Sequence, residues 1–275
     1  MRWLLLKRPG YRGKRRQKPL EEIKLKSLLT AFRFLTILPL RVKTEESDEL
    51  LASSMAFFPL VGLFIGGFLF LVYRISSILF SPLLVNALVL IAWVFITGAL
   101  HLDGFMDTID GLSGGKTKEE RLKIMKDPSS GAKGTVGLVG LLGLKFLLLL
   151  EIEPFLKTGT LLLTPVVGRW SMVTAAYLAP YARGEGLGKA FITRKGEGTI
   201  FWASLTVTLL GLVIFKFPFL YIIGVCLGIT YLSTLYFKSR MGGITGDTLG
   251  ALNEIIELTA LFSIYSLSKA RVFLS

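Results

Sequence analysis

Long apolar stretches recur along most of the 275-residue chain, separated by short polar segments. A transmembrane helix needs about 20 consecutive and mostly apolar residues, so each stretch of that length is a candidate span. Seven segments qualify, and they are 53–73, 82–101, 135–152, 160–180, 200–216, 218–236 and 249–267. The pattern predicts an all-α fold, a polytopic membrane bundle with about seven transmembrane helices.

The chain ahead of these segments has a different pattern. Residues 27–40 are mostly apolar but too short to cross a bilayer, so they predict an interfacial or re-entrant helix. Basic residues dominate the beginning of the chain, because residues 1–43 hold 13 Lys and Arg against two acids. We therefore expect two parts: a basic cytoplasmic N-terminal arm, 1–26, and a single helical transmembrane domain, 27–275.

The composition agrees with a membrane protein, and the position of the net charge indicates which kind of binding partner to expect. Charged residues make up only 19% of the chain, against about 25% in soluble domains. The net charge is +13, but beyond residue 43 the chain carries 32 − 13 = 19 bases and 19 − 2 = 17 acids. The basic arm is therefore expected to bind anionic lipid. No motif that reads nucleic acid accompanies it, so we expect no nucleic-acid partner.

The loops between the predicted spans alternate in charge. The loops 102–134, 181–199 and 237–248 are rich in Lys and Arg, whereas the intervening loops hold three such residues in all. Basic loops tend to stay on the cytoplasmic side of a membrane. We therefore expect the N-terminus and these three loops to face the cytoplasm.

One of the basic loops begins with an acidic cluster. Asp103, Asp107 and Asp110 stand at positions i, i+4 and i+7, so on a helix they share one face within an arc of roughly 60°. Carboxylates crowded at the end of a span repel each other, and a hard divalent cation removes that cost. Mg²⁺, held by carboxylates and by substrate phosphates, fits such a site. A solvated acidic helix end is the alternative.

A second acidic cluster lies at the start of the last predicted span. Asp247 and Glu254 are seven residues apart, and Glu257 follows one turn later. Acids inside an apolar span are rare and usually functional. Both clusters begin at the same predicted face, which suits a two-metal phosphotransfer site with one carboxylate as general base. An intramembrane ion pair, for example Glu254 with Arg169, is the alternative.

Basic residues near these acids are candidates for phosphate binding. Phosphotransfer needs cations that offset the charge developing on the phosphoryl oxygens. The loop between the clusters supplies three of them, and a fourth lies inside a predicted span. They are Arg121, Lys126, Lys133 and Arg169. Together with the two acidic clusters, they predict that the domain 27–275 is catalytic.

Several motifs resemble one family in order, from about residue 27 to residue 268. The sequence is similar to cobalamin synthase, adenosylcobinamide-GDP ribazoletransferase. The most specific motifs are His101–Gly111, with its spaced aspartates, and Ile124–Asp127. The supporting motifs are Phe32–Pro39, Phe58–Gly62, Gly168–Trp170, Tyr181–Arg183 and Gly243–Asp247.

The resemblance implies a reaction that closes the nucleotide loop of cobalamin. The 5′-hydroxyl of α-ribazole, or of its 5′-phosphate, attacks the cobinamide-proximal phosphorus of adenosylcobinamide-GDP, and GMP leaves. It also implies a multi-pass protein of a prokaryotic plasma membrane with a cytoplasmic active site, and an oligomer is compatible with it. In this scheme Asp103, Asp107 and Asp110 bind Mg²⁺. Asp247, Glu254 and Glu257 complete the site or supply the base, and the four basic residues hold phosphates.

Three other classes of membrane protein fit parts of the pattern. A CDP-alcohol phosphotransferase of lipid synthesis has Ala-Arg where this chain has Asp107. A prenyltransferase with paired aspartate-rich motifs lacks its second motif here, because Gly243–Asp247 does not provide it. A cation-coupled transporter predicts acids near the middle of the membrane and related halves. The acids of this chain lie near one face, and no repeat is visible.

Overall fold

The structure is a computed structural model that describes residues 20–40, 47–186, 188–194, 196 and 198–270. These residues form helices, and their one β contact is an isolated bridge between Tyr181 and Ile244. The predicted all-α fold is therefore confirmed. The basic residues 1–19 of the predicted lipid-binding arm lie outside the described residues.

The helices are α1 Leu20–Leu35, α2 Asp48–Ser54, the 3₁₀ turn η1 Met55–Phe57, α3 Phe58–Ser76, α4 Pro82–Thr97, α5 Leu100–Gly114, α6 Lys118–Ile124, α7 Ala132–Glu151, α8 Pro154–Leu178, α9 Gly188–Thr193, α10 Thr199–Phe215, α11 Pro218–Met241 and α12 Gly246–Lys269.

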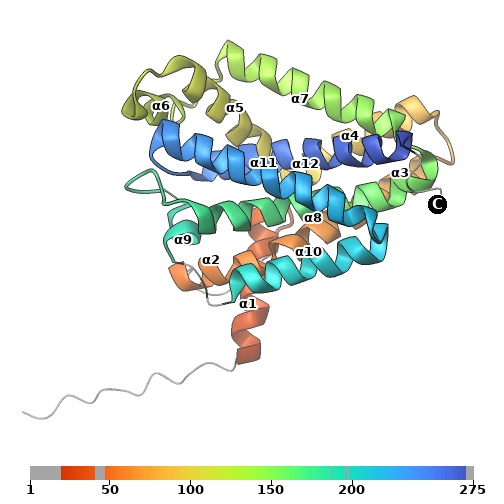
Figure 1. Cartoon of the computed structure of the whole chain (residues 1–275), viewed down its shortest axis with the longest axis horizontal. Helices are drawn as coiled ribbons and strands as arrows, with labels where there is room; N and C mark the ends of the chain where they lie inside the picture. The colour runs from red at the N-terminus through yellow and green to blue at the C-terminus, as the bar shows by residue number, and fades with distance from the viewer. Residues whose placement is uncertain (1–19, 41–46, 187, 195, 197, 271–275) are drawn as a thin grey trace, which may run out of the picture.

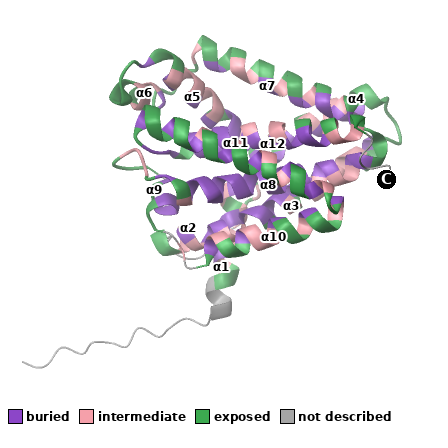
Figure 2. Cartoon of the chain, viewed as in Figure 1, coloured by how far each residue is buried: buried purple, intermediate pink, exposed green. Residues whose placement is uncertain are grey.

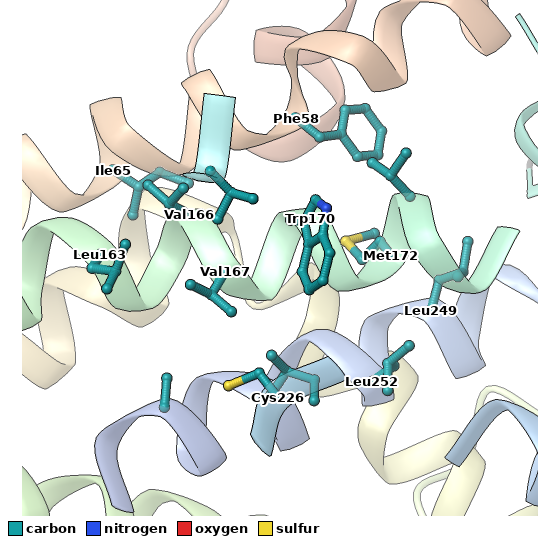
Figure 3. Close-up of a cluster of buried hydrophobic side chains, with 14 of the residues drawn as sticks. Phe58, Ile65, Leu163, Val166, Val167, Trp170, Met172, Cys226, Leu249 and Leu252 are labelled. Carbon is teal, nitrogen blue, oxygen red and sulfur yellow. The ribbon is translucent and has the colours of Figure 1, made fainter. Parts of the chain in front are cut away.

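Helix α8 runs through the middle of the bundle (Figure 1). Most of its residues are buried, whereas α7 and α11 leave many residues exposed (Figure 2). Its apolar side chains, including Val166 and Trp170, meet residues of α3, α11 and α12 in one core (Figure 3). Because most of α8 faces other helices, it positions the charged residue Arg169 inside the protein.

Close backbone packing holds α3 against α8. A Cβ on Gly62 would meet the backbone of Pro165 and Val166, and one on Gly66 would meet that of Leu161. Only glycine allows two helices to approach so closely, and small residues are common where membrane helices pack. This contact fixes the central helix against one side of the bundle.

The predicted spans lie almost entirely within helices, but they do not all qualify as spans. Among the described residues, four segments are long and apolar enough to cross a membrane: Asp48–Ser76, Ala132–Glu151, Pro154–Leu178 and Pro218–Met241. Helices α4 and α5 make a fifth if the bent pair counts as one span. Helix α10 is apolar but has only 17 residues, and α12 carries two glutamates. The structure thus supports four or five spans by length and composition, against the seven that the sequence predicts.

A sharp break interrupts the predicted span 82–101. Gly98 and Ala99 both adopt the left-handed conformation, with φ of 59° and 57°. Such a conformation ends an α-helix, and it is uncommon for a residue other than glycine. Helix α5 therefore starts at Leu100 and turns by 87° from α4. The turn carries the first acidic cluster along the end of the bundle.

The three basic loops gather at one end of the molecule. Figure 1 shows α5, α6 and α9 together at the end of the bundle opposite the C-terminus. These helices belong to the loops 102–134 and 181–199, and the loop 237–248 joins α11 to α12 beside them. The three loops that the sequence predicts to share one side therefore lie at one end of the fold.

Candidate active site

Helices α5 and α12 touch through their backbones at the end of the bundle where the basic loops gather. A Cβ on Gly104 would lie 2.8 Å from the carbonyl oxygen of Asp247, and one on Gly250 would lie 3.2 Å from Cα of His101. Because neither glycine has a side chain, the two helices can approach this closely. This contact brings the first turn of α12 beside the acidic face of α5.

Backbone hydrogen bonds fix the loops on either side of this contact. Ala182 N–H donates to the carbonyl of Ile244, and Ile244 N–H donates to the carbonyl of Pro180, both at 2.9 Å. Next to this bridge, Thr245 caps α12, and its side chain accepts from the backbone of Thr248 at 3.2 Å. The two loops are thus held side by side, at the start of the helix that carries Asp247.

Arg183 and Asp247 form an ion pair in this position, with Nη2 and Oδ2 2.7 Å apart. Asp103 and Asp107 also lie within electrostatic range of Asp247. Asp103 is exposed and Asp107 half-buried, so both are accessible to a ligand. Three carboxylates against one guanidinium leave two formal negative charges at one point. This cluster is the candidate active site, and its carboxylate oxygens are the kind of ligand that a divalent cation such as Mg²⁺ prefers.

The third aspartate of α5, Asp110, contacts the start of another helix. The backbone N–H groups of Gly131 and Gly134 each donate to the Asp110 carboxylate at 2.8 Å. Gly131 is the N-cap of α7, so Asp110 caps that helix from α5 and meets its positive end. Both carboxylate oxygens have a backbone donor. Asp110 therefore has backbone partners of its own in the structure, although it shares a helix face with Asp103 and Asp107 and lies within electrostatic range of Asp107.

The glutamates of the second cluster lie in a buried charge network. Lys145 on α7 places its Nζ 2.5 Å from Glu254 and 2.5 Å from Glu257. Arg169 on α8 pairs with Glu257 and places Nη2 3.4 Å from His101 Nδ1. All five side chains are buried. The ion-pair alternative is thus present in the structure, with Glu257 and not Glu254 as the partner of Arg169. Neither glutamate joins the cluster around Asp247.

The predicted phosphate-binding residues of the loop 102–134 lie at the same end of the bundle. Arg121 Nη1 donates to the carbonyl of Arg240 at 2.9 Å, at the end of α11. Lys133 Nζ donates to the carbonyl of Ser113 at 3.0 Å, at the end of α5, and Lys126 is exposed. Cations are favoured at helix C-termini, so the first two side chains also stabilise the helices that form the site.

The segment between α6 and α7 has its own local order. The hydroxyl and the backbone N–H of Ser129 both donate to Oδ1 of Asp127. These hydrogen bonds favour the ionised carboxylate and lower the pKa of Asp127. Asp127 therefore stays charged, and its carboxylate is engaged by Ser129 two residues later. It stabilises this local turn and does not add to the acidic cluster.

Two cations of these clusters were not among the predicted site residues. Lys145 is the one charged residue in the apolar stretch 135–150, and that isolation is a signal for an intramembrane ion pair. Arg183 is the last residue of a family motif, Tyr181–Arg183, but nothing in its spacing indicates Asp247 as its partner. The bridge between Tyr181 and Ile244 creates that contact, and it joins segments about sixty residues apart.

Comparison with known proteins identifies the family of this chain. The family model described as cobalamin-5-phosphate synthase matches residues 27–265, which include every residue of the candidate active site. The chain belongs to the cobalamin-5-phosphate synthase family. The family resemblance predicted from the motifs is confirmed, and the chain is an enzyme of the transferase class. The N-terminal residues 1–26 lie outside the match.

Curated relatives of the family cover most of the chain. The adenosylcobinamide-GDP ribazoletransferase of Thermoanaerobacter pseudethanolicus is 36% identical over 253 residues, which is 90% of this chain and 100% of the relative. The enzymes of the same name from Desulforamulus reducens and Acinetobacter baumannii are each 38% identical, over 86% and 85% of this chain and 95% and 94% of their own length. No solved structure matches the chain.

Proposed function

We propose that this chain is a Mg²⁺-dependent adenosylcobinamide-GDP ribazoletransferase, acting at the cytoplasmic face of a prokaryotic plasma membrane. Its substrates are adenosylcobinamide-GDP and α-ribazole or α-ribazole 5′-phosphate. Its products are GMP and adenosylcobalamin or its 5′-phosphate. The names of its relatives support the reaction. The meeting of Asp103, Asp107 and Asp247 beside Arg183 carries the proposal, because that arrangement suits a pyrophosphate substrate.

The chemistry requires an alcohol to displace GMP from phosphorus. The 5′-oxygen of α-ribazole forms a bond to the cobinamide-proximal phosphorus, the bond from that phosphorus to the bridging oxygen breaks, and GMP leaves with that oxygen. The hydroxyl proton passes to a carboxylate. Little covalent chemistry falls to the protein in such a transfer, so positioning and charge stabilisation dominate.

Asp103, Asp107 and Asp247 would hold Mg²⁺. Among the described residues, no three or more His, Cys, Asp and Glu side chains are grouped so that they could hold a metal ion by themselves. Mg²⁺ is usually bound by one or two carboxylates plus substrate phosphates, so the phosphates of the substrate would complete its coordination here. Bound there, the ion would neutralise charge on the phosphates. The exposed Asp103 and the half-buried Asp107 are placed to take part.

Asp247 is also our choice for the general base, through the carboxylate oxygen that would not bind Mg²⁺, because it lies in the accessible cluster with a quarter of its side chain exposed. Lys126, Lys133 and Arg121 are at the same end of the bundle, and their cations would face the phosphates. For Glu254, Glu257 and Arg169, a direct part in the reaction would require buried ion pairs to break. We therefore propose that these three hold the helices of the site in register.

The test of the function is a direct assay with a matched control. Membranes containing the protein are incubated with adenosylcobinamide-GDP and α-ribazole, with Mg²⁺ or with EDTA, and GMP and the completed corrinoid are measured. Asp107→Asn should lower turnover by at least about a hundredfold, in the range of losing an electrostatic contact in a transition state. Asp48→Asn should keep wild-type turnover, because Asp48 is exposed on α2 and pairs with Arg194 at 3.8 Å.

Each outcome of this assay decides a part of the proposal. Turnover that needs Mg²⁺ and is lost in Asp107→Asn supports both the reaction and the metal site. Turnover that persists in Asp107→Asn would refute the metal assignment and leave the reaction standing. Absence of product from folded wild-type protein with any divalent cation would refute the reaction itself.

A further inference from the structure

Arg183 is the cation that offsets the acidic cluster in this structure. Its Nη2 lies 2.7 Å from Asp247, and its charge also acts on Asp107. Its side chain is only 12% exposed, so it is packed at the site and does not extend into solvent. Without it, three carboxylates would face one another with no counter-charge. Arg183 thus occupies the electrostatic position that a divalent cation would take.

The guanidinium of Arg183 is only partly satisfied. One nitrogen pairs with Asp247, and Nη2 is also 3.5 Å from the carbonyl of Met125, at the limit of a hydrogen bond. The buried Nε has no hydrogen-bond partner among the described residues. A buried donor left without a partner costs free energy, and a planar guanidinium binds best when two of its nitrogens are engaged. The free Nε donor can therefore take an additional oxygen acceptor.

The surroundings favour a movement of the side chain alone. The backbone beside Arg183 is fixed, because Ala182 donates to Ile244 and Ile244 donates to Pro180. A divalent cation at Asp247 carries twice the charge of a guanidinium and binds carboxylate oxygens more strongly. It would repel Arg183 from Asp247 and leave its donors free beside the metal.

We propose that Arg183 alternates between two partners: Asp247 when the site holds no metal, and the diphosphate of the nucleotide substrate when a divalent cation has replaced it. This inference rests on the proposed function and deepens it, because it names the residue that recognises the diphosphate. Arginine suits this role, since its fork of N–H donors matches phosphate oxygens in bidentate contacts. In this scheme Arg183 competes with the metal and cooperates with the substrate.

The neighbouring cations are less suited to such an exchange. Arg121 and Lys133 donate to backbone carbonyls at the ends of α11 and α5. Arg194 belongs to the same loop region as Arg183, but it pairs with Glu49 at 2.6 Å and is more than half exposed. Arg183 is therefore the arginine that contacts a carboxylate of the cluster, and Arg194 is its matched control.

The competition predicts opposite changes in two affinities for one substitution. Arg183→Gln removes the competing charge, so the substrate-free protein should bind Mn²⁺ about tenfold more tightly, measured by electron paramagnetic resonance of the free ion. The same variant should bind adenosylcobinamide-GDP at least about tenfold more weakly in the presence of Mg²⁺ and the absence of α-ribazole, because a charge-assisted contact is lost. Arg194→Gln should change neither affinity.

A second variant separates charge from shape. Arg183→Lys keeps the charge but loses the bidentate fork, so its Mn²⁺ affinity should stay within about twofold of wild type while substrate binding weakens. A purely structural role would weaken both affinities together. If Arg183→Gln binds Mn²⁺ more weakly, or binds the substrate as wild type does, this inference is overturned and the proposed function still stands. Wild-type protein that binds Mn²⁺ but no adenosylcobinamide-GDP overturns the proposed function, and the inference with it.

Discussion

The buried network around Lys145 predicts a large and specific loss of stability. The network holds two cations, Lys145 and Arg169, against two anions, Glu254 and Glu257, so it is neutral as a whole. Lys145→Met replaces the ammonium by an apolar group of similar length. It leaves two carboxylates with one counter-charge in the buried interior of the bundle.

The size of the effect follows from the burial of these groups. Breaking a buried ion pair by removing one partner costs about 3–5 kcal/mol, because the remaining charge stays uncompensated. Lys145 contacts both glutamates at 2.5 Å and also lies 4.8 Å from the ring centre of Trp93, so all of its partners are lost together. We expect a loss of about 3–5 kcal/mol in the free energy of unfolding.

The assay is denaturation of the protein in mild detergent, in which the fraction of protein that remains folded is measured. Lys157→Met is the matched control, because Lys157 is equally buried but contacts neutral oxygens of Asn86 and Leu149. Its removal leaves no charge behind, so a loss of about 1–3 kcal/mol is expected, from the neutral oxygens left without a donor. The double variant Lys145→Met with Glu254→Gln should recover at least half of the loss, because it makes the network neutral again.

Two results would contradict this reasoning. If Lys145→Met is no less stable than Lys157→Met, the network does not hold both glutamates in their charged form. If the double variant is less stable than Lys145→Met alone, the charge balance does not govern the loss. In either case, the proposal that these glutamates hold the site in register would fail.

Two further predictions concern the helices of the site. Asp110→Ala should destabilise the protein by about 1–3 kcal/mol and speed hydrogen exchange at Gly131 and Gly134, because both amides lose a charged acceptor, while Mn²⁺ affinity stays unchanged. A drop in Mn²⁺ affinity would instead make Asp110 a metal ligand. Gly104→Val should lower turnover at least about tenfold, since its side chain would push α5 away from Asp247. Gly140→Val, where a Cβ meets open space, should leave turnover near wild type; equal losses in both would contradict the role of this contact.

The pattern along the chain predicted the features that depend on local sequence. Apolar length predicted the helices, and helical periodicity placed Asp103 and Asp107 on one face, where the structure also has them. Charge alternation predicted which loops gather at one end, and Asp247 was expected near the first cluster for that reason. The family motifs were confirmed by the comparison. Each of these features arises within about two helical turns or from the order of the segments.

The tertiary structure decided which group each charged side chain meets. Periodicity shows that Asp110 shares a face with Asp107, but only the position of α7 directs Asp110 to the N-terminus of that helix. Lys145 meets Glu257 across 112 residues. Arg183 reaches Asp247 because the isolated β-bridge between Tyr181 and Ile244 joins distant loops. The break at Gly98 and Ala99 also rests on packing, since an apolar sequence continues through it. A local pattern determines which residues share a helix face, whereas the packing of the helices determines what that face contacts.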